Sequence, residues 1–152
     1  MEDFDFNREI PEFLADCRTA SLATVGPDGR PHAANVQYVH DESLKLYFVS
    51  SSESAHSRHV GDGAPVAATI YARNDQPDHI RGVQIHGVCR PVHDETAMNR
   101  VWELYVEKFA FAQTYPMRRT IESQQFYELT PHWMRWIDNR RGFGWKVERE
   151  LD

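Results

Sequence analysis

The sequence has few cysteines and a deficit of positive charge. Cys17 and Cys89 are the two cysteines among 152 residues. They lie far apart and fit no metal-binding or redox spacing, so we expect packed, reduced thiols. Seventeen Lys and Arg stand against 23 Asp and Glu, which gives a net charge of −6 at pH 7. This balance argues against nucleic acid as the main partner, because phosphate backbones are bound by clustered Lys and Arg.

Long hydrophobic runs are also missing. No apolar stretch approaches the length that spans a bilayer, and the negative charge disfavours an electrostatic membrane anchor. The first residues, Met-Glu-Asp-Phe-Asp-Phe-Asn, are acidic and lack the basic and apolar regions of a signal peptide. We therefore expect a cytoplasmic protein. Its 41% hydrophobic residues suffice for one core, which predicts a single domain over 1–152.

Apolar periodicity and turn residues divide the chain into short elements. Pro11 suits the first position of a helix, and Gly87 inside a strand pattern indicates a bulge or a close backbone approach. Helices are predicted at 10–17, after Ser54 as far as Gly61, and at 94–109. Strands are predicted at 20–25, 33–39, 44–49, 66–71, 82–92, 125–129 and 133–138, with 142–148 as an extension, and loops at 72–79 and 110–123.

These strands are short and separated by turns, which favours antiparallel pairing. The pattern predicts a mainly β (α+β) fold, a small barrel with helical insertions. A Rossmann fold is disfavoured, because no Gly-x-Gly-x-x-Gly follows a strand and strands do not alternate regularly with helices.

A serine-rich turn with histidines after it is the most informative segment. It reads Ser-Ser-Ser-Glu-Ser-Ala-His-Ser-Arg-His over 50–59 and follows an alternating strand pattern. Hydroxyls and cationic side chains beside a helix N-terminus can hold a phosphate. Ser52 or Ser54 can equally serve as an N-cap. Both interpretations stay open on the sequence.

The order of motifs resembles that of a known family. Ala20-Ser-Leu-Ala-Thr-Val precedes the turn Gly-Pro-Asp-Gly-Arg-Pro, and then come Ala-Asn-Val-Gln-Tyr, Leu-Tyr-Phe-Val-Ser-Ser and Arg-Gly-Val-Gln-Ile-His-Gly. This order resembles the FMN-binding split-barrel proteins similar to pyridoxamine 5′-phosphate oxidase. The resemblance covers about 10–148. It implies a six- to seven-stranded antiparallel split barrel and a homodimer with two flavin sites at its interface.

The resemblance also implies which positions hold the cofactor. The flavin ring would lie against the second strand, and the phosphate near the end of the third strand and the helix after it. A residue of the partner's fifth strand, at the position of Gln84, would cover the ring. Trp145, near the C-terminus, is a weaker candidate for the same role. The implied cofactor residues are Asn35, Val36, Gln37, Ser50, Ser51, Ser54, His56, Arg58 and Gln84.

Three departures separate this chain from the B6 oxidases. Those enzymes carry Arg and Lys where Ala34 and Val39 stand here. They carry Ser-Arg-Lys where this chain has Ser54-Ala55-His56. Their C-terminal Arg-x-His is missing. We therefore expect a flavin-dependent oxidoreductase of this type that is not itself a B6 oxidase.

One alternative is a non-enzymatic ligand-binding or sensing dimer that takes haem, deazaflavin or another planar ligand. No catalytic residue can be assigned, because the flavin ring carries the redox chemistry in this class. His56 and His59 have a spacing that can hold a metal, but no third ligand is near in sequence, so we expect no metal site. The small-molecule substrate stays unidentified.

Overall fold

A computed structural model of the chain describes residues 3–74 and 76–152. Met1, Glu2 and Asp75 lie outside the described residues. The acidic N-terminal segment and the predicted loop at 72–79 therefore fall partly outside them.

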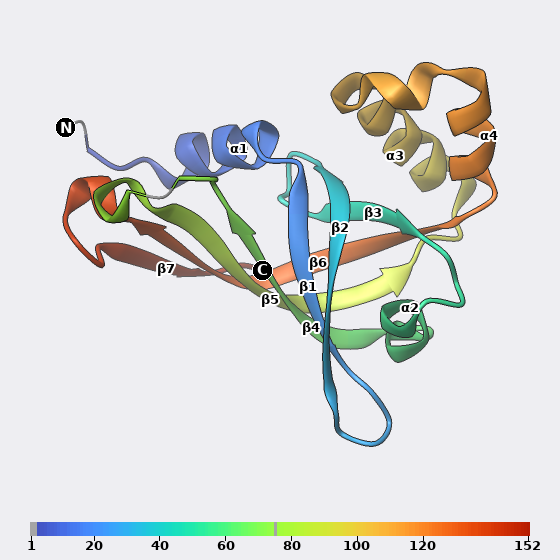
Figure 1. The fold of residues 1–152 in the computed structure, drawn as a ribbon, viewed down its shortest axis with the longest axis horizontal. Helices are drawn as coiled ribbons and strands as arrows, with labels where there is room; N and C mark the ends of the chain where they lie inside the picture. The colour runs from blue at the N-terminus through green and yellow to red at the C-terminus, as the bar shows by residue number, and fades with distance from the viewer. Residues whose placement is uncertain (1–2, 75) are drawn as a thin grey trace.

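Six antiparallel strands form a closed barrel (Figure 1). They are β1 (Thr19–Val25), β2 (Pro31–His40), β3 (Leu46–Ser50), β4 (Ala64–Tyr71), β5 (Arg81–Pro91) and β6 (Gln125–Asp138). Their order is β3-β2-β1-β4-β5-β6, and pairing of β3 with β6 closes the ring. A seventh strand, β7 (Lys146–Glu150), extends the sheet from β6. The predicted mainly β split barrel is confirmed.

Side chains alternate between the barrel interior and its outer face. On β1, Ala20, Leu22 and Thr24 are buried, whereas the residues between them are exposed. This period of two places one apolar set inside, as expected for a half-buried sheet. The interior side chains of all six strands join those of the first helix in one continuous core.

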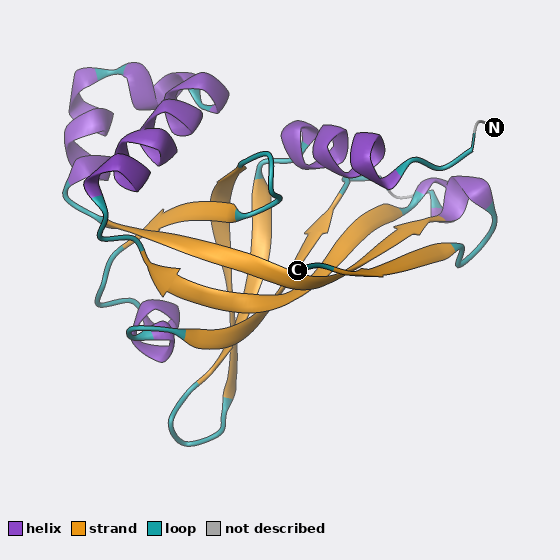
Figure 2. Cartoon of the chain, turned by 180° about the vertical axis from the view of Figure 1, so that it is seen from behind, coloured by secondary structure: helices purple, strands orange, loops and turns teal. Residues whose placement is uncertain are grey.

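Four helices lie around the barrel (Figure 2). They are α1 (Phe6–Asp16), α2 (Ala55–Val60), α3 (Glu95–Lys108) and α4 (Tyr115–Glu122), with 3-10 turns at Pro77–His79, Ala110–Gln113 and Asn139–Arg141. Both ribbon views place α1, α3 and α4 on the same side of the barrel. Among the described residues, no helix is long and apolar enough to cross a membrane.

The predicted start of the first helix and the predicted loop at 110–123 were wrong. Helix α1 begins at Phe6, because the Asp5 carboxylate accepts a hydrogen bond from the Asn7 N–H (3.0 Å) and caps the helix there. Pro11 consequently lies inside the helix and not at its first position. The predicted loop at 110–123 instead forms a 3-10 turn and α4, with Pro116 near the helix start and Ile121 buried.

The last two predicted strand pieces form one strand, β6, of 14 residues. Pro131 gives the sequence its apparent break. In the structure Pro131 lies opposite Gly87, where the register between β5 and β6 shifts. This irregularity confirms the predicted bulge at Gly87, and it lets the strand continue through a residue that has no N–H to donate.

Gly87→Ala is expected to destabilise the protein more than the same change at an open glycine. An added Cβ would clash with the Thr130 carbonyl oxygen and lie 2.9 Å from Leu129 Cδ2. We expect a loss of about 3 kcal/mol in the free energy of unfolding, measured by urea denaturation. Gly29→Ala is the control, since nothing lies within 4 Å of its added Cβ and only its φ of +80° opposes alanine, at a cost of about 1–2 kcal/mol. Equal losses at both positions would contradict this assignment.

Candidate functional site

The barrel is split between β2 and β3, and the split exposes a strand edge. In the described part of the chain, β3 pairs with β2 only over Tyr38–His40. The Tyr38 N–H donates to the Arg18 carbonyl on the β1 side (3.2 Å). Because backbone groups of alternate residues point to opposite edges, Asn35 and Gln37 direct their N–H and C=O groups away from β1, into the split. This edge can form hydrogen bonds with a planar polar ring.

Helix α3 already occupies one group of that edge. The Tyr105 hydroxyl donates to the Gln37 carbonyl oxygen (3.0 Å). Asn35 has its side chain on the outer face, where its amide oxygen accepts from the Ser21 hydroxyl (2.8 Å). Val36 points its side chain into the barrel and is buried. The predicted ring contacts on β2 thus consist of two outward-facing residues and one core residue.

At the end of β3, hydroxyls and an imidazole form one network. His56 Nε2 lies 2.7 Å from Ser50 Oγ and 3.2 Å from Ser54 Oγ. The two serine hydroxyls are 3.3 Å apart. Ser54 is also the N-cap of α2, because its Oγ accepts from the Ser57 N–H (3.3 Å). The capping interpretation therefore holds for Ser54, and the same hydroxyl belongs to the polar cluster.

Helix α2 is fixed across β1 and β2 by histidine contacts that sequence reasoning missed. His59 Nδ1 lies 2.8 Å from Oγ1 of Thr24, which is buried on β1. The His32 ring of β2 meets the His59 ring edge-on, with centroids 5.6 Å apart. These pairs join positions 35 and 27 residues apart, so no local pattern reveals them. They fix α2, which carries His56, against β1 and β2.

The charge of this cluster is low. Burial lowers the pKa of His56 from its usual 6.5, and the neighbouring His32 and His59 lower it further. His56 is therefore neutral at pH 7, and the permanent cation of the segment is Arg58, which is exposed on α2. Ser51 and Glu53 are exposed too; the Ser51 hydroxyl accepts from the Glu53 N–H (3.2 Å). Donors for a phosphate are present, with little positive charge.

Gln84 lies in the same cross-strand row as Asn35 but far from it. The register pairs Asn35 with Ser21, Ser21 with Thr69, and Thr69 with Gln84. Three strand spacings of about 4.8 Å separate the two ends, about 14 Å in all. The structure therefore does not bring Gln84 to the other predicted residues within one chain. Arg135 continues the row and donates to the Gln84 amide oxygen (3.3 Å).

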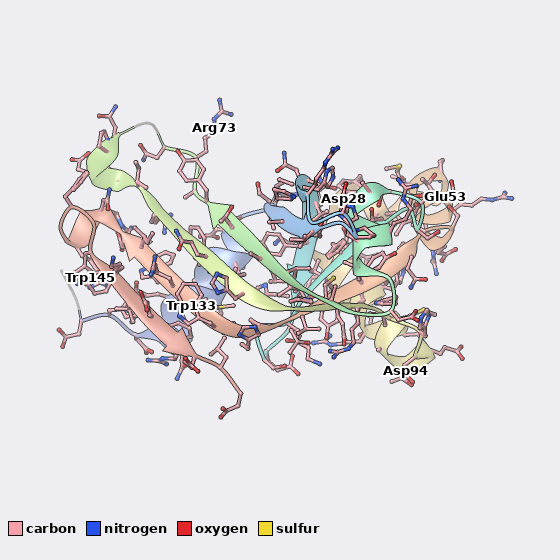
Figure 3. The ribbon with its side chains drawn as sticks, turned by 90° about the horizontal axis from the view of Figure 1, so that it is seen from below. Asp28, Glu53, Arg73, Asp94, Trp133 and Trp145 are labelled. Atoms are coloured by element: carbon pink, nitrogen blue, oxygen red, sulfur yellow. The ribbon has the colours of Figure 1, made fainter. Side chains whose placement is uncertain are left out.

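Two aromatic residues near the C-terminus lie in different environments (Figure 3). The Trp133 ring on β6 stacks on His86 of β5, with centroids 4.4 Å apart. Trp145 instead packs against Phe4 (5.4 Å) and the Arg141 guanidinium (5.1 Å), near α1. Trp133 thus faces the outer surface beside Gln84, whereas Trp145 belongs to the packing of the chain ends.

Known proteins resemble this chain in sequence and in fold. The "UPF0306 protein" of Klebsiella pneumoniae is 32% identical over 130 residues, which cover 84% of this chain and 82% of that protein. A conserved hypothetical protein from Mycobacterium tuberculosis has a similar structure, with a TM-score of 0.78, 23% identity, and coverage of 91% of this chain and 88% of that one.

A third similar structure is described as a heme binding protein from Mycobacterium smegmatis. Its TM-score is 0.79 at 18% identity, and the match covers 99% of this chain and 60% of that one. At such identities the two structural matches establish the fold alone. The family model for "Pyridoxamine 5'-phosphate oxidase", in contrast, matches residues 6–138 directly. This match spans the barrel, α2 and α3, so the chain belongs to the pyridoxamine 5′-phosphate oxidase family.

Proposed function

We propose that this protein binds FMN in the split between β2 and β3 and acts as a flavin-dependent oxidoreductase other than a B6 oxidase. The outward edge of β2, with the backbone groups of Asn35 and the N–H of Gln37, carries this proposal together with the Ser50–Ser54–His56 cluster at the end of β3. A flavin ring has a carbonyl and imide edge that complements unpaired strand N–H and C=O groups. When bound, the flavin supplies the electron-transfer chemistry.

The chain's own residues would orient the cofactor. Asn35 and Gln37 would hold the ring edge. Ser50, Ser54 and His56 would hydrogen-bond the phosphate, and Arg58 would supply the charge, with Ser51 at the margin. Because one cation faces a group carrying about −1.5 to −2 charges, we expect weaker FMN binding than in a site with several Arg and Lys.

We also propose that the site is completed in a homodimer. Gln84 is about 14 Å from Asn35 in the same chain, so it can cover the ring only from a second subunit. The side chains on the outer face of the sheet in this region are small and partly apolar, since Ala23 pairs with both Ala33 and Ala67. A two-fold axis at this patch would bring each Gln84 towards the other subunit's β2.

Haem is the second candidate ligand. His86 is an exposed imidazole stacked on Trp133, on the outer sheet face beside Gln84. Imidazole is a common axial ligand of haem iron, and an aromatic ring can pack on the porphyrin. The similar structure from Mycobacterium smegmatis is described as a heme binding protein. Deazaflavin has the same planar shape as flavin and would use the β2 edge in the same way.

Ser50→Ala combined with His56→Gln is expected to weaken FMN binding without preventing folding. The pair loses the two groups 2.7 Å apart that face the phosphate position, and the loss of such bonds lowers affinity by about ten- to a hundredfold. Quenching of flavin fluorescence measures the dissociation constant. His79→Gln is the control, since His79 is exposed on a 3-10 turn. Unchanged FMN affinity in the double variant would show that the cluster only caps the helix and does not bind the phosphate.

Ala67→Glu is expected to convert the dimer to monomers and to weaken FMN binding with it. A carboxylate in the middle of the outer face would oppose its copy across the two-fold axis and would be desolvated there. Light scattering of the purified protein measures the mass. Thr120→Glu, on the exposed surface of α4, is the control. A wild-type mass of 17.7 kDa in solution would contradict the dimer proposal directly.

His86→Ala is expected to distinguish the two cofactors. If haem binds at His86, titration of the wild type with hemin produces a Soret band of a His-ligated iron, and the variant loses it. FMN affinity in the variant should change less than tenfold, because β2 and α2 provide most contacts. A hemin spectrum identical in both proteins would rule out His86 as the axial ligand.

A further inference from the structure

A cavity lies beside the C-terminal half of α3. Its volume is about 360 Å³, and it opens between the end of α1, the end of β2 and α3. Basic groups of three segments line it, together with three apolar side chains and one acid. The lining residues are Ala15, Arg18, Val39, His40, Leu104, Glu107 and Lys108. Cavities of this size hold small organic ligands.

Lys108 reaches this cavity from the last turn of α3. Its Nζ donates to the Leu14 carbonyl oxygen (3.0 Å) in the last turn of α1, and the Tyr38 hydroxyl donates to the same oxygen (2.7 Å). The Nζ also lies 4.0 Å from the centre of the Tyr38 ring. Lysine thus satisfies a helix-end carbonyl, which explains the direction of its side chain. This hydrogen bond does not account for the second cation near Lys108, which is Arg18.

Arg18 and Lys108 lie close to the same aromatic ring. The Arg18 guanidinium carbon is 5.4 Å from the centre of the Phe109 ring, and Lys108 Nζ is 5.7 Å from it. Across 3–74 and 76–152, no carboxylate lies within 4.0 Å of either cation. Two like charges therefore share one wall of a cavity with no fixed anion between them, in a protein whose net charge is −6.

Burial dominates the titration of the groups around this cavity. Burial lowers the pKa of Lys108 to about 8; Arg18 adds to the shift, while Cys17 and Asp16 oppose it. Burial and Lys108 together lower the pKa of His40, against the opposing effect of Asp41. The Asp41 carboxylate is itself occupied by the Tyr47 hydroxyl (2.9 Å) and the Lys45 N–H (3.0 Å). Glu107, the one acid of the lining, is exposed at the rim.

We propose that this cavity binds a small organic acid, with its carboxylate between Arg18 and Lys108 and its apolar part against Ala15 and Leu104. The bound carboxylate would form charge-assisted hydrogen bonds with both cations and remove their mutual repulsion. Ala15 and Leu104 provide the apolar surface that favours an organic acid over a bare inorganic ion. This site is separate from the Ser50–His56 cluster and does not depend on the flavin proposal.

Benzoate is the probe, and benzamide is its uncharged counterpart of the same shape. Isothermal titration of the full chain should show benzoate binding at one site, with benzamide at least tenfold weaker. Arg18→Gln and Lys108→Met should each weaken benzoate by about ten- to a hundredfold, the effect of losing a hydrogen bond to a charged group. Arg73→Gln is the matched control, because Arg73 points away from the molecule into solvent (Figure 3).

Proton uptake supplies a second, independent measurement. Lys108 is about half protonated at pH 8, since its pKa is about 8. A bound carboxylate raises this pKa, so binding at pH 8 should take up as much as about half a proton. Titrations in buffers of different ionisation enthalpy measure the uptake, and affinity should fall as pH rises above 8. Lys108→Met should bind without this uptake.

Three outcomes would overturn the proposal. Benzamide could bind as tightly as benzoate, which would identify an apolar cavity without an anion site. Arg73→Gln could weaken benzoate as much as Arg18→Gln, which would identify non-specific attraction. Benzoate could fail to bind the wild type at millimolar concentration. Arg18→Gln keeps the test decisive if Lys108→Met fails to fold, because the exposed Arg18 caps no helix.

Discussion

The short strand β3 is the constraint on which the rest of the structure depends. Its five residues pair with β6 over their whole length but with β2 over only three positions. Closure of the barrel on one side therefore leaves the edge of β2 that faces away from β1 without a strand partner along 35–37. Unpaired strand N–H and C=O groups must find other partners, and in this chain α2 and α3 are placed beside them. A longer β3 would close the split and remove the candidate site.

Features encoded in a few adjacent residues could be predicted from the sequence. Ser54 and Asp94 cap helices because each has a short polar side chain just before a helical pattern, and the strands follow from alternation. Features that depend on distant residues could not. Pro131 suggests a break in β6, and only its position opposite Gly87 on β5 explains why the strand continues. The helix α4 was missed because many of its residues are polar or charged, and because Ile121, which is buried, packs on a separate core cluster.

The same distinction applies to the candidate site. The serines, His56 and the β2 segment were named from the order of motifs, and the family model matches the chain over 6–138. Their arrangement depends on contacts across long separations: Thr24 with His59, and Tyr105 with Gln37. The separation of Gln84 from Asn35 follows from strand order, which no local pattern specifies. Sequence reasoning thus identified groups suited to a cofactor but not which of them one chain can bring together.

Packing accounts for the valine at position 39, where the B6 oxidases carry a lysine. Val39 is 2% exposed and lies in an apolar cluster with Val101, Tyr105 and Phe109 of the α3 segment. A lysine at this position would place its ammonium group in that cluster at the cost of desolvation. Positive charge therefore reaches this end of β2 from other elements, from Arg18 after α1 and from Lys108 at the end of α3. The strands keep their geometry, while the cations near the end of β2 come from neighbouring elements. A chain can therefore belong to this family and still bind a different small molecule.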